Sequence, residues 1–229
     1  MRLSPALLEL DSMVVNIELT LSSIVQGVAL TFLVENTRSS LSIHDAATWL
    51  YALAGLCIIF IFWSRSILHT LTLIRWPIEF GHNFLYIACT LAECLLFTCL
   101  RNPLAWFEAS LLYGLAVWIL FAYDMRMTRL READLLSEAS RRLSRLIERD
   151  SKLNVRLLMP ALVAFNGLCA GSVHLWPGCF LARHGHVWLI AAQLLGLTIY
   201  LCYVIRFSSR LAPIVVTHQE ERRALATDH

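Results

Sequence analysis

Six apolar runs of about 20 residues recur along the chain, and no other feature constrains its fold as strongly. A helix of that length crosses a hydrocarbon core of about 30 Å. Hydrophobic residues make up 58% of the 229 residues and charged residues only 16%, against about 25% in soluble domains. We therefore predict an all-α polytopic membrane protein with six transmembrane helices. The predicted spans cover about residues 13–34, 46–64, 80–100, 104–123, 157–177 and 187–205.

The basic residues predict an orientation for this bundle. Sixteen of the nineteen Lys and Arg residues lie on the side that holds both chain ends, and three lie on the other side. Segments rich in Lys and Arg stay in the cytoplasm, so both termini are predicted to be cytoplasmic. Residues 1–12 contain Glu9 and Asp11 and lack a small-residue cleavage site. The first span is therefore expected to act as an uncleaved insertion signal.

The segment from Asp124 to Asn154 has no Pro or Gly and is dense in Arg, Glu, Leu and Ala. Its apolar residues recur at spacings of three and four, which predicts one amphipathic cytoplasmic helix about 30 residues long. The stripe consists of Leu136, Ala139, Leu143 and Leu146. Such a helix either lies solvated at the lipid headgroups or binds a second copy or a soluble partner, and the pattern leaves both readings open.

These elements predict four parts in the chain. They are transmembrane helices one to four in residues 1–123, the Arg-rich cytoplasmic helix in 124–156, helices five and six in 157–206, and a cytoplasmic tail in 207–229.

Small and polar residues crowd one side of the first span. On a helical wheel, Thr20, Ser23 and Gly27 fall within about 60° of one another. Spacing of small residues by four lets two helix backbones approach closely inside a membrane. This small-residue stripe therefore predicts a helix-packing contact.

A second arc lies beside the stripe and consists of Ile24, Val28, Thr31 and Glu35. An arc of apolar residues that ends in a carboxylate at the outer mouth fits the wall of a narrow pore, because apolar constrictions gate by dewetting and acidic rings gather cations. The periodicity of the first span fits packing and pore lining alike.

The run from Leu21 to Val34 resembles the first helix of the transmembrane protein 175 family, whose motif begins Phe-Ser-Asp. The positions that fit are Ser22, Val25, Ala29, Thr31, Leu33 and Val34. An aromatic run ending in Trp63 resembles the second family helix. Leu21 and Ser23 replace the Phe and Asp of the motif, and Ser66 and Ile67 stand where the family has paired histidines.

That resemblance implies a potassium channel without a P-loop filter, built as a homotetramer with the first helix around its axis. Val28 and Thr31 match family pore positions. Bacterial members have six spans of this length, which implies the bacterial inner membrane as the location.

Glu18 and Glu93 are the carboxylates that lie most clearly inside predicted spans. A charge at mid-membrane costs about 2.5–3.5 kcal/mol on insertion scales, so such a group indicates function by default. Glu18 also fits a position facing the headgroups, and Glu93 fits either a hydrogen-bonded structural role or an ion or proton pathway. Glu79 and His82 share a helix face, but one pair is a weak metal signal.

The remaining motifs exclude several classes. Six of the seven cysteines fall in predicted spans without a C-x-x-C pair, so we interpret them as packing thiols. No phosphate-binding loop, H-E-x-x-H or G-x-S-x-G motif occurs, so no enzyme is predicted. A net charge of +2 does not favour a nucleic-acid partner, and we expect no cofactor or metal.

We therefore expect a homo-oligomeric cation channel in contact with the lipid bilayer. The alternative is a non-conducting membrane anchor or effector subunit, which would bind a soluble partner through residues 124–154.

Overall fold

The computed structural model describes residues 5–40, 46–73, 80–131 and 138–227, and every regular element in these ranges is a helix. The helices are α1 (Pro5–Ser40), α2 (Ala46–Leu73), α3 (Phe80–Phe97), α4 (Pro103–Arg131), α5 (Glu138–Leu153), the π-helical turn η2 (Asn154–Leu158), α6 (Met159–Leu175), α7 (Pro177–Phe180) and α8 (His186–Thr227). The all-α prediction is confirmed for these residues.

Five stretches of helix are long and apolar enough to cross a membrane: Met13–Ser39, Ala47–Thr70, Pro103–Met127, Arg142–Leu175 and His186–Thr217. A shorter apolar helix covers Gly81–Phe97. Asn102 and Pro103 begin α4, where the Asn102 Oδ1 accepts a hydrogen bond from the Ala105 amide at 3.1 Å. The repeated long apolar helices indicate a multi-pass membrane protein.

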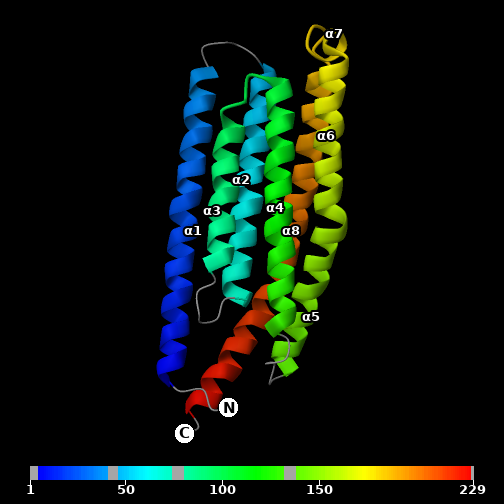
Figure 1. Ribbon diagram of the computed structural model, residues 1–229. Coiled ribbons are helices and arrows are strands. Elements are labelled where there is room, and N and C mark those ends of the chain that lie inside the picture. The colour runs from blue at the N-terminus through cyan, green and yellow to red at the C-terminus, as the bar shows by residue number, and fades with distance from the viewer. Residues whose placement is uncertain (1–4, 41–45, 74–79, 132–137, 228–229) are drawn as a thin grey trace.

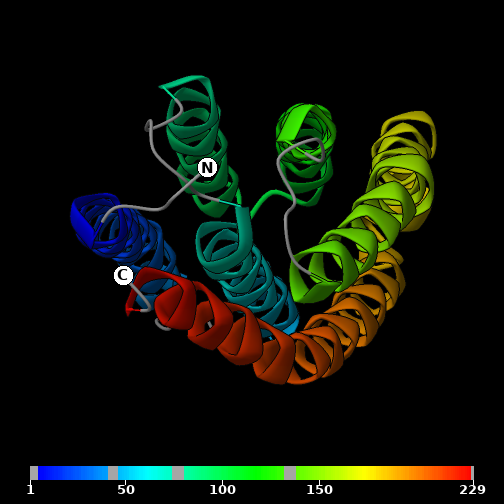
Figure 2. The same cartoon turned by 90° about the horizontal axis from the view of Figure 1, so that it is seen from below.

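The helices stand side by side as a bundle (Figure 1). α1 packs on α2 and α3, α4 packs on α3 and α6, and α2 packs on α8. Seen along the bundle, α2 (cyan) lies inside an arc formed by the other long helices (Figure 2). The first turn of α1 and the last turns of α8 lie at the same end, which we call the terminal end. We call the opposite end the far end.

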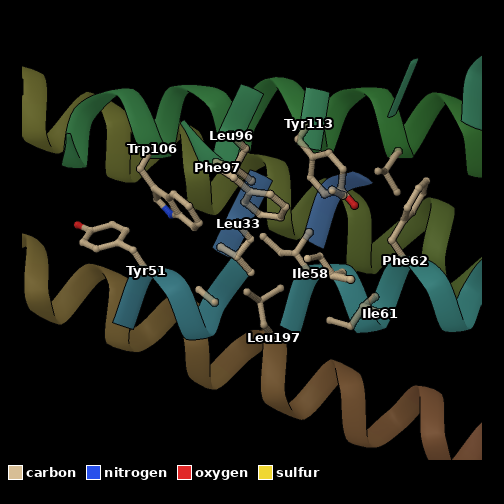
Figure 3. Packing of buried hydrophobic residues seen from close by; sticks show 14 of the residues in the cluster. Leu33, Tyr51, Ile58, Ile61, Phe62, Leu96, Phe97, Trp106, Tyr113 and Leu197 are labelled. Atoms are coloured by element: carbon tan, nitrogen blue, oxygen red, sulfur yellow. The ribbon is translucent and has the colours of Figure 1, made fainter. Parts of the chain in front are cut away.

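The core lies where α2 faces α3 and α4, and it is rich in aromatic side chains (Figure 3). Phe97 and Trp106 are fully buried, and Phe62 packs edge-on against Tyr113. The Trp106 Nε1 donates a hydrogen bond to the Gln193 Oε1 at 2.8 Å, which satisfies its polar edge. Such close contacts hold a bundle together in lipid, where the tails are as apolar as the side chains.

The segment predicted as one helix over 124–154 has a different arrangement. Asp124 to Arg131 continue α4, whereas α5 runs back along α4 and leads through η2 into α6 (Figure 1). Residues 132–137 lie outside the described residues, as does the side chain of Ala139. The reason for the reversal is packing, because Leu143 and Ile147 of α5 are buried against Leu211 of α8.

The predicted orientation places the two ends of the bundle on opposite sides of the membrane. Single cysteines at Ser40 and Ser140, in a background without other cysteines, should therefore label differently with an impermeant thiol reagent. We expect Ser40→Cys to react in intact cells and Ser140→Cys only after permeabilisation, because positive-inside loops stay in the cytoplasm. Labelling of both from the same side would contradict the orientation and the six-span arrangement.

Gly55 permits a close contact between three helices near the far end. A Cβ at Gly55 would lie 2.9 Å from the Leu33 Cδ1 and 3.0 Å from the Phe97 Cε1. We expect Gly55→Val to lower stability by about 1–3 kcal/mol, since overpacking a filled core forces side chains and backbone to shift. Thermal unfolding in detergent measures the effect. Gly171→Val is the control, because a Cβ there meets nothing within 4 Å, and an equal loss in both variants would contradict the packing argument.

Candidate functional site

Buried polar side chains form a line through the bundle of α1 to α4. On α3, spacings of four, four and three place His82, Tyr86, Thr90 and Glu93 on one buried face. The other helices supply Ser22 and Gln26 from α1, Ser66 and His69 from α2, and Asp124 from α4. We call these nine residues the polar line. It runs from the terminal end to Glu93, about one turn before the end of α3 at Phe97.

Glu93 is the inner end of the polar line and is 0% exposed. The Gln26 Nε2 donates long hydrogen bonds to the Glu93 Oε2 at 3.4 Å and to the Thr90 Oγ1 at 3.5 Å. Among the described residues, three buried side-chain atoms have no hydrogen-bond partner: the Gln26 Oε1, the Glu93 Oε1 and the Tyr86 hydroxyl. All three belong to the polar line, so its inner part is under-satisfied where an unpaired polar atom costs about 1–3 kcal/mol.

Hydroxyl groups form the middle of the polar line. The Ser22 and Ser66 hydroxyls are 2.8 Å apart and share a hydrogen bond in which either can donate. The Tyr86 hydroxyl lies beside Ser22, Ser66 and Gln26. The Phe62 ring stacks on Tyr86 with centroids 5.0 Å apart and covers one side of it. A hydroxyl group can both donate and accept a hydrogen bond, so each of these side chains can bond to more than one neighbour.

Two histidines and one aspartate form the terminal end of the polar line. The Asp124 Oδ1 lies 2.8 Å from the His82 Nδ1, and the Asp124 Oδ2 lies 3.4 Å from the His69 Nδ1. The two imidazole rings stack with centroids 4.0 Å apart and planes 7° apart. One carboxylate therefore serves two imidazoles that come from α2 and α3.

A second ionic cluster lies next to this histidine pair. The Arg65 guanidinium donates to the Asp150 Oδ2 at 2.7 Å, and the Tyr203 hydroxyl donates to the Asp150 Oδ1 at 2.6 Å. The Tyr200 hydroxyl donates to the Asn154 Oδ1, on the π-helical turn. A cleft of about 60 Å³ between the two clusters is lined by Arg65, Leu68, His69, Phe121, Asp124, Ile147, Asp150, Ser151, Asn154, Phe207 and Leu211.

The polar line stops at a tightly packed apolar layer. Beyond Glu93 toward the far end, Leu33 of α1 and Phe97 of α3 close around Gly55 of α2. Leu96 and Phe97 are fully buried there. The polar line is therefore closed by apolar packing on its far side.

The residues predicted to line a pore lie on the outside of the chain. Ile24 is 62% exposed, Val28 is 48% exposed, and Thr31 and Glu35 are also exposed. They face away from the other helices, toward lipid or a second copy. Their role in a pore between copies stays a prediction.

The small-residue stripe also lies outside. Thr20, Ser23 and Gly27 are exposed, and a Cβ at Gly27 would meet nothing within 4 Å. The Thr20 hydroxyl donates to the Asn16 carbonyl and the Ser23 hydroxyl to the Leu19 carbonyl. Among the described residues the stripe is thus exposed, and a contact with a second copy is the form of the prediction that stays open.

The predicted carboxylates both lie on buried faces. Glu93 is the inner end of the polar line, and the Glu18 Oε1 accepts a hydrogen bond from the Asn83 Nδ2 at 2.8 Å. The weak pair of Glu79 and His82 cannot be compared, because Glu79 lies outside the described residues. His82 instead meets His69 and Asp124.

Sequence reasoning missed His69, Asp124 and the Arg65–Asp150 pair. The predicted second and fourth spans ended at residues 64 and 123, whereas α2 continues to Leu73 and α4 to Arg131. The available signal was the continued spacing of Phe62, Ser66 and His69 along one face of α2. This spacing did not predict a site, because polar residues at the end of a span are also typical of the headgroup region.

Comparison of the chain with protein-family models, with curated proteins and with solved structures finds no match. The resemblance to the transmembrane protein 175 family therefore stays a prediction.

The Arg65–Asp150 pair should dominate the stability of the terminal end. Both side chains are at most 10% exposed, so Arg65→Met leaves a buried carboxylate without its cation and should cost about 3–5 kcal/mol. Combining it with Asp150→Leu should recover much of that loss, because an apolar pair avoids burying a lone charge. Thermal unfolding in detergent measures both variants.

Lys152→Met provides the matched control for this prediction. It removes an ion pair of 2.6 Å with Glu148 in which the lysine is 41% exposed. Exposed pairs are worth about 0–1 kcal/mol, so little change is expected. A loss as large as that of Arg65→Met would mean that burial does not set the strength of these pairs.

Proposed function

We propose that this protein is a six-span integral membrane protein that moves cations, with the proton as the cation that its interior suits best. The path enters at the terminal end, on the cytoplasmic side, and follows the polar line to Glu93. The observation that carries the proposal is the fully buried Glu93, whose Oε1 has no partner among the described residues. Ionisable groups inside a membrane are costly and mark ion or proton pathways.

The chemistry of the line favours protons over larger cations. Imidazole, hydroxyl and carboxyl groups each exchange a proton, and the His82–Asp124 contact, the Ser22–Ser66 hydrogen bond and Glu93 all belong to the polar line. A potassium ion needs several oxygens to replace its hydration shell. The space around Glu93 is filled by packed side chains, which supports proton transfer better than passage of a hydrated ion.

The far side of the path needs a gate. Leu33 and Phe97 close on Gly55 and offer no polar group to a cation. An apolar constriction blocks ions because it cannot replace their hydration shell. The proposed cycle therefore loads Glu93 from the terminal end and requires this apolar layer to open before release.

The outer face of α1 supports a second part of the proposal, a homo-oligomer with α1 at its interface. Large apolar side chains and small residues alternate there without an in-chain contact. A tetramer with Ile24, Val28, Thr31 and Glu35 around its axis is the arrangement that the family resemblance implies. In this arrangement a pore between copies is the rival to the path inside each copy.

The anchor reading receives less support from the contacts. The described part of the apolar stripe in 124–154, Leu143 and Leu146, packs against the chain's own α8. Where burial in this segment is described, the exposed side chains are charged, such as Arg142, Arg145 and Arg149. A partner at this helix would therefore be acidic.

Proton flux tests the proposed path. In liposomes with a potassium gradient and valinomycin, a trapped pH dye should report proton entry through the wild type. Glu93→Gln should lower the rate at least tenfold, because an amide has the same shape but no exchangeable carboxyl proton. A tenfold change corresponds to about 1.4 kcal/mol in the barrier. Glu108→Gln, at an exposed carboxylate on α4, is the matched control and should leave the rate unchanged.

Three results would contradict the proposal in different ways. Folded wild type that passes no H⁺, K⁺ or Na⁺ would favour the anchor reading. Flux that survives Glu93→Gln but rises in Val28→Asn would place the path between copies, along the arc of α1. Flux that falls equally in Glu93→Gln and Glu108→Gln would show a loss of folding rather than of a path.

A further inference from the structure

His69, His82 and Asp124 meet at the terminal end of the bundle from three different helices. One potential ligand atom from each residue lies within 4.8 Å of the other two, and in the described part of the chain this is the one cluster of that kind. His82 is buried, and the other two are largely buried. We propose that these three residues form a binding site for a divalent transition-metal ion of the zinc class.

The donor atoms select this class of ion. Imidazole nitrogen suits Zn²⁺, Co²⁺, Ni²⁺ and Cu²⁺, whereas Mg²⁺ and Ca²⁺ require oxygen ligands almost throughout. Two histidines and one carboxylate also make the ligand set of open zinc sites, which keep a fourth position for water. The site therefore holds its ion with an exchangeable position rather than as a closed structural centre.

The distances need only small adjustments. The Asp124 carboxylate lies 2.8 Å from the His82 Nδ1 and 3.4 Å from the His69 Nδ1. Ligand atoms about 2.0–2.2 Å from a tetrahedral zinc ion lie about 3.3 Å from one another. The carboxylate is thus already close to that spacing from each nitrogen, and the two histidine ligand atoms lie within 4.8 Å of each other.

The two rings must turn to bind. Their planes are 7° apart and their centroids 4.0 Å apart, whereas each nitrogen lone pair lies in its own ring plane. A shared ion therefore requires the rings to rotate about their Cβ–Cγ bonds. That torsion has a broad energy well, so side-chain rotation suffices and the three helices can stay in place.

The cleft between α2, α4, α5 and α8 gives an ion access. It has a volume of about 60 Å³, and both His69 and Asp124 line it. The proposed proton path begins at the same residues. If the protein conducts protons along this path, a bound ion occupies the first proton-exchanging groups and blocks the flux. This effect on flux depends on the proposed function, whereas the metal site does not.

Metal binding to the purified protein tests the site directly. For this experiment the protein should carry an affinity tag without histidine and have its cysteines replaced by serine. Equilibrium dialysis against Zn²⁺ should give one ion per chain, and Co²⁺ should give the visible absorption of a four-coordinate ion. Asp124→Asn and His69→Phe should each weaken binding at least tenfold. His174→Asn, at an exposed histidine of α6, is the control and should bind as the wild type does.

The outcomes separate this site from the alternatives. Unchanged binding in Asp124→Asn and His69→Phe would overturn the proposal. Binding lost in His184→Asn instead would assign the ion to His184 and His186, whose rings lie 6.0 Å apart at the far end. Where the variants fail to fold, Zn²⁺ should protect His69 and His82 of the wild type from diethyl pyrocarbonate, read by mass spectrometry, and equal modification with and without Zn²⁺ would overturn the site. Zinc binding without proton flux would end the proposed function alone.

Discussion

Hydrocarbon offers no hydrogen-bond partner, so every polar side chain in this bundle must find one within the protein. α1 answers this constraint in two ways. On its outer face, the hydroxyls of Thr20, Ser23 and Thr31 bond to backbone carbonyls one turn earlier in their own helix. On its inner face, Ser22 and Gln26 bond across to α2 and α3. The polar residues of α1 therefore bond to their own helix on the outer face and to neighbouring helices on the inner face.

Hydrogen bonding on the inner face of α1 is incomplete near Glu93. The bonds from Gln26 to Thr90 and Glu93 are 3.5 and 3.4 Å long, whereas the Ser22–Ser66 and His82–Asp124 contacts are 2.8 Å. The hydrogen bonds to Glu93 and Thr90 are thus longer than the Ser22–Ser66 and His82–Asp124 contacts. A buried acid held by one long bond gains little from its neighbours in either protonation state. Its hydrogen bond therefore contributes little to holding α1 and α3 together in either protonation state.

The helical bundle could be predicted from the sequence because the lengths of the apolar runs and the positions of Pro are local signals. Glu93 was accessible for the same reason, since a carboxylate inside an apolar run stands out. The convergence of His69, His82 and Asp124 was not, because their positions in the chain give no hint that α2, α3 and α4 meet there. On α1 both faces carry small polar residues, so periodicity favoured the outer stripe, and only the contacts of Ser22 and Gln26 identify the face that packs.

An apolar layer beyond Glu93 separates the polar line from the far end of the bundle. Gly55 lacks a Cβ, and this lets Leu33 and Phe97 close to within 3.0 Å of where one would stand. A larger residue on α2 would hold these helices apart and open the low-dielectric seal. Around Gly55 the contacts are made by apolar side chains, which exclude water from the far side of Glu93. Tight apolar packing next to Glu93 thus makes its weak hydrogen bonding more costly, because water cannot reach the unpaired Oε1.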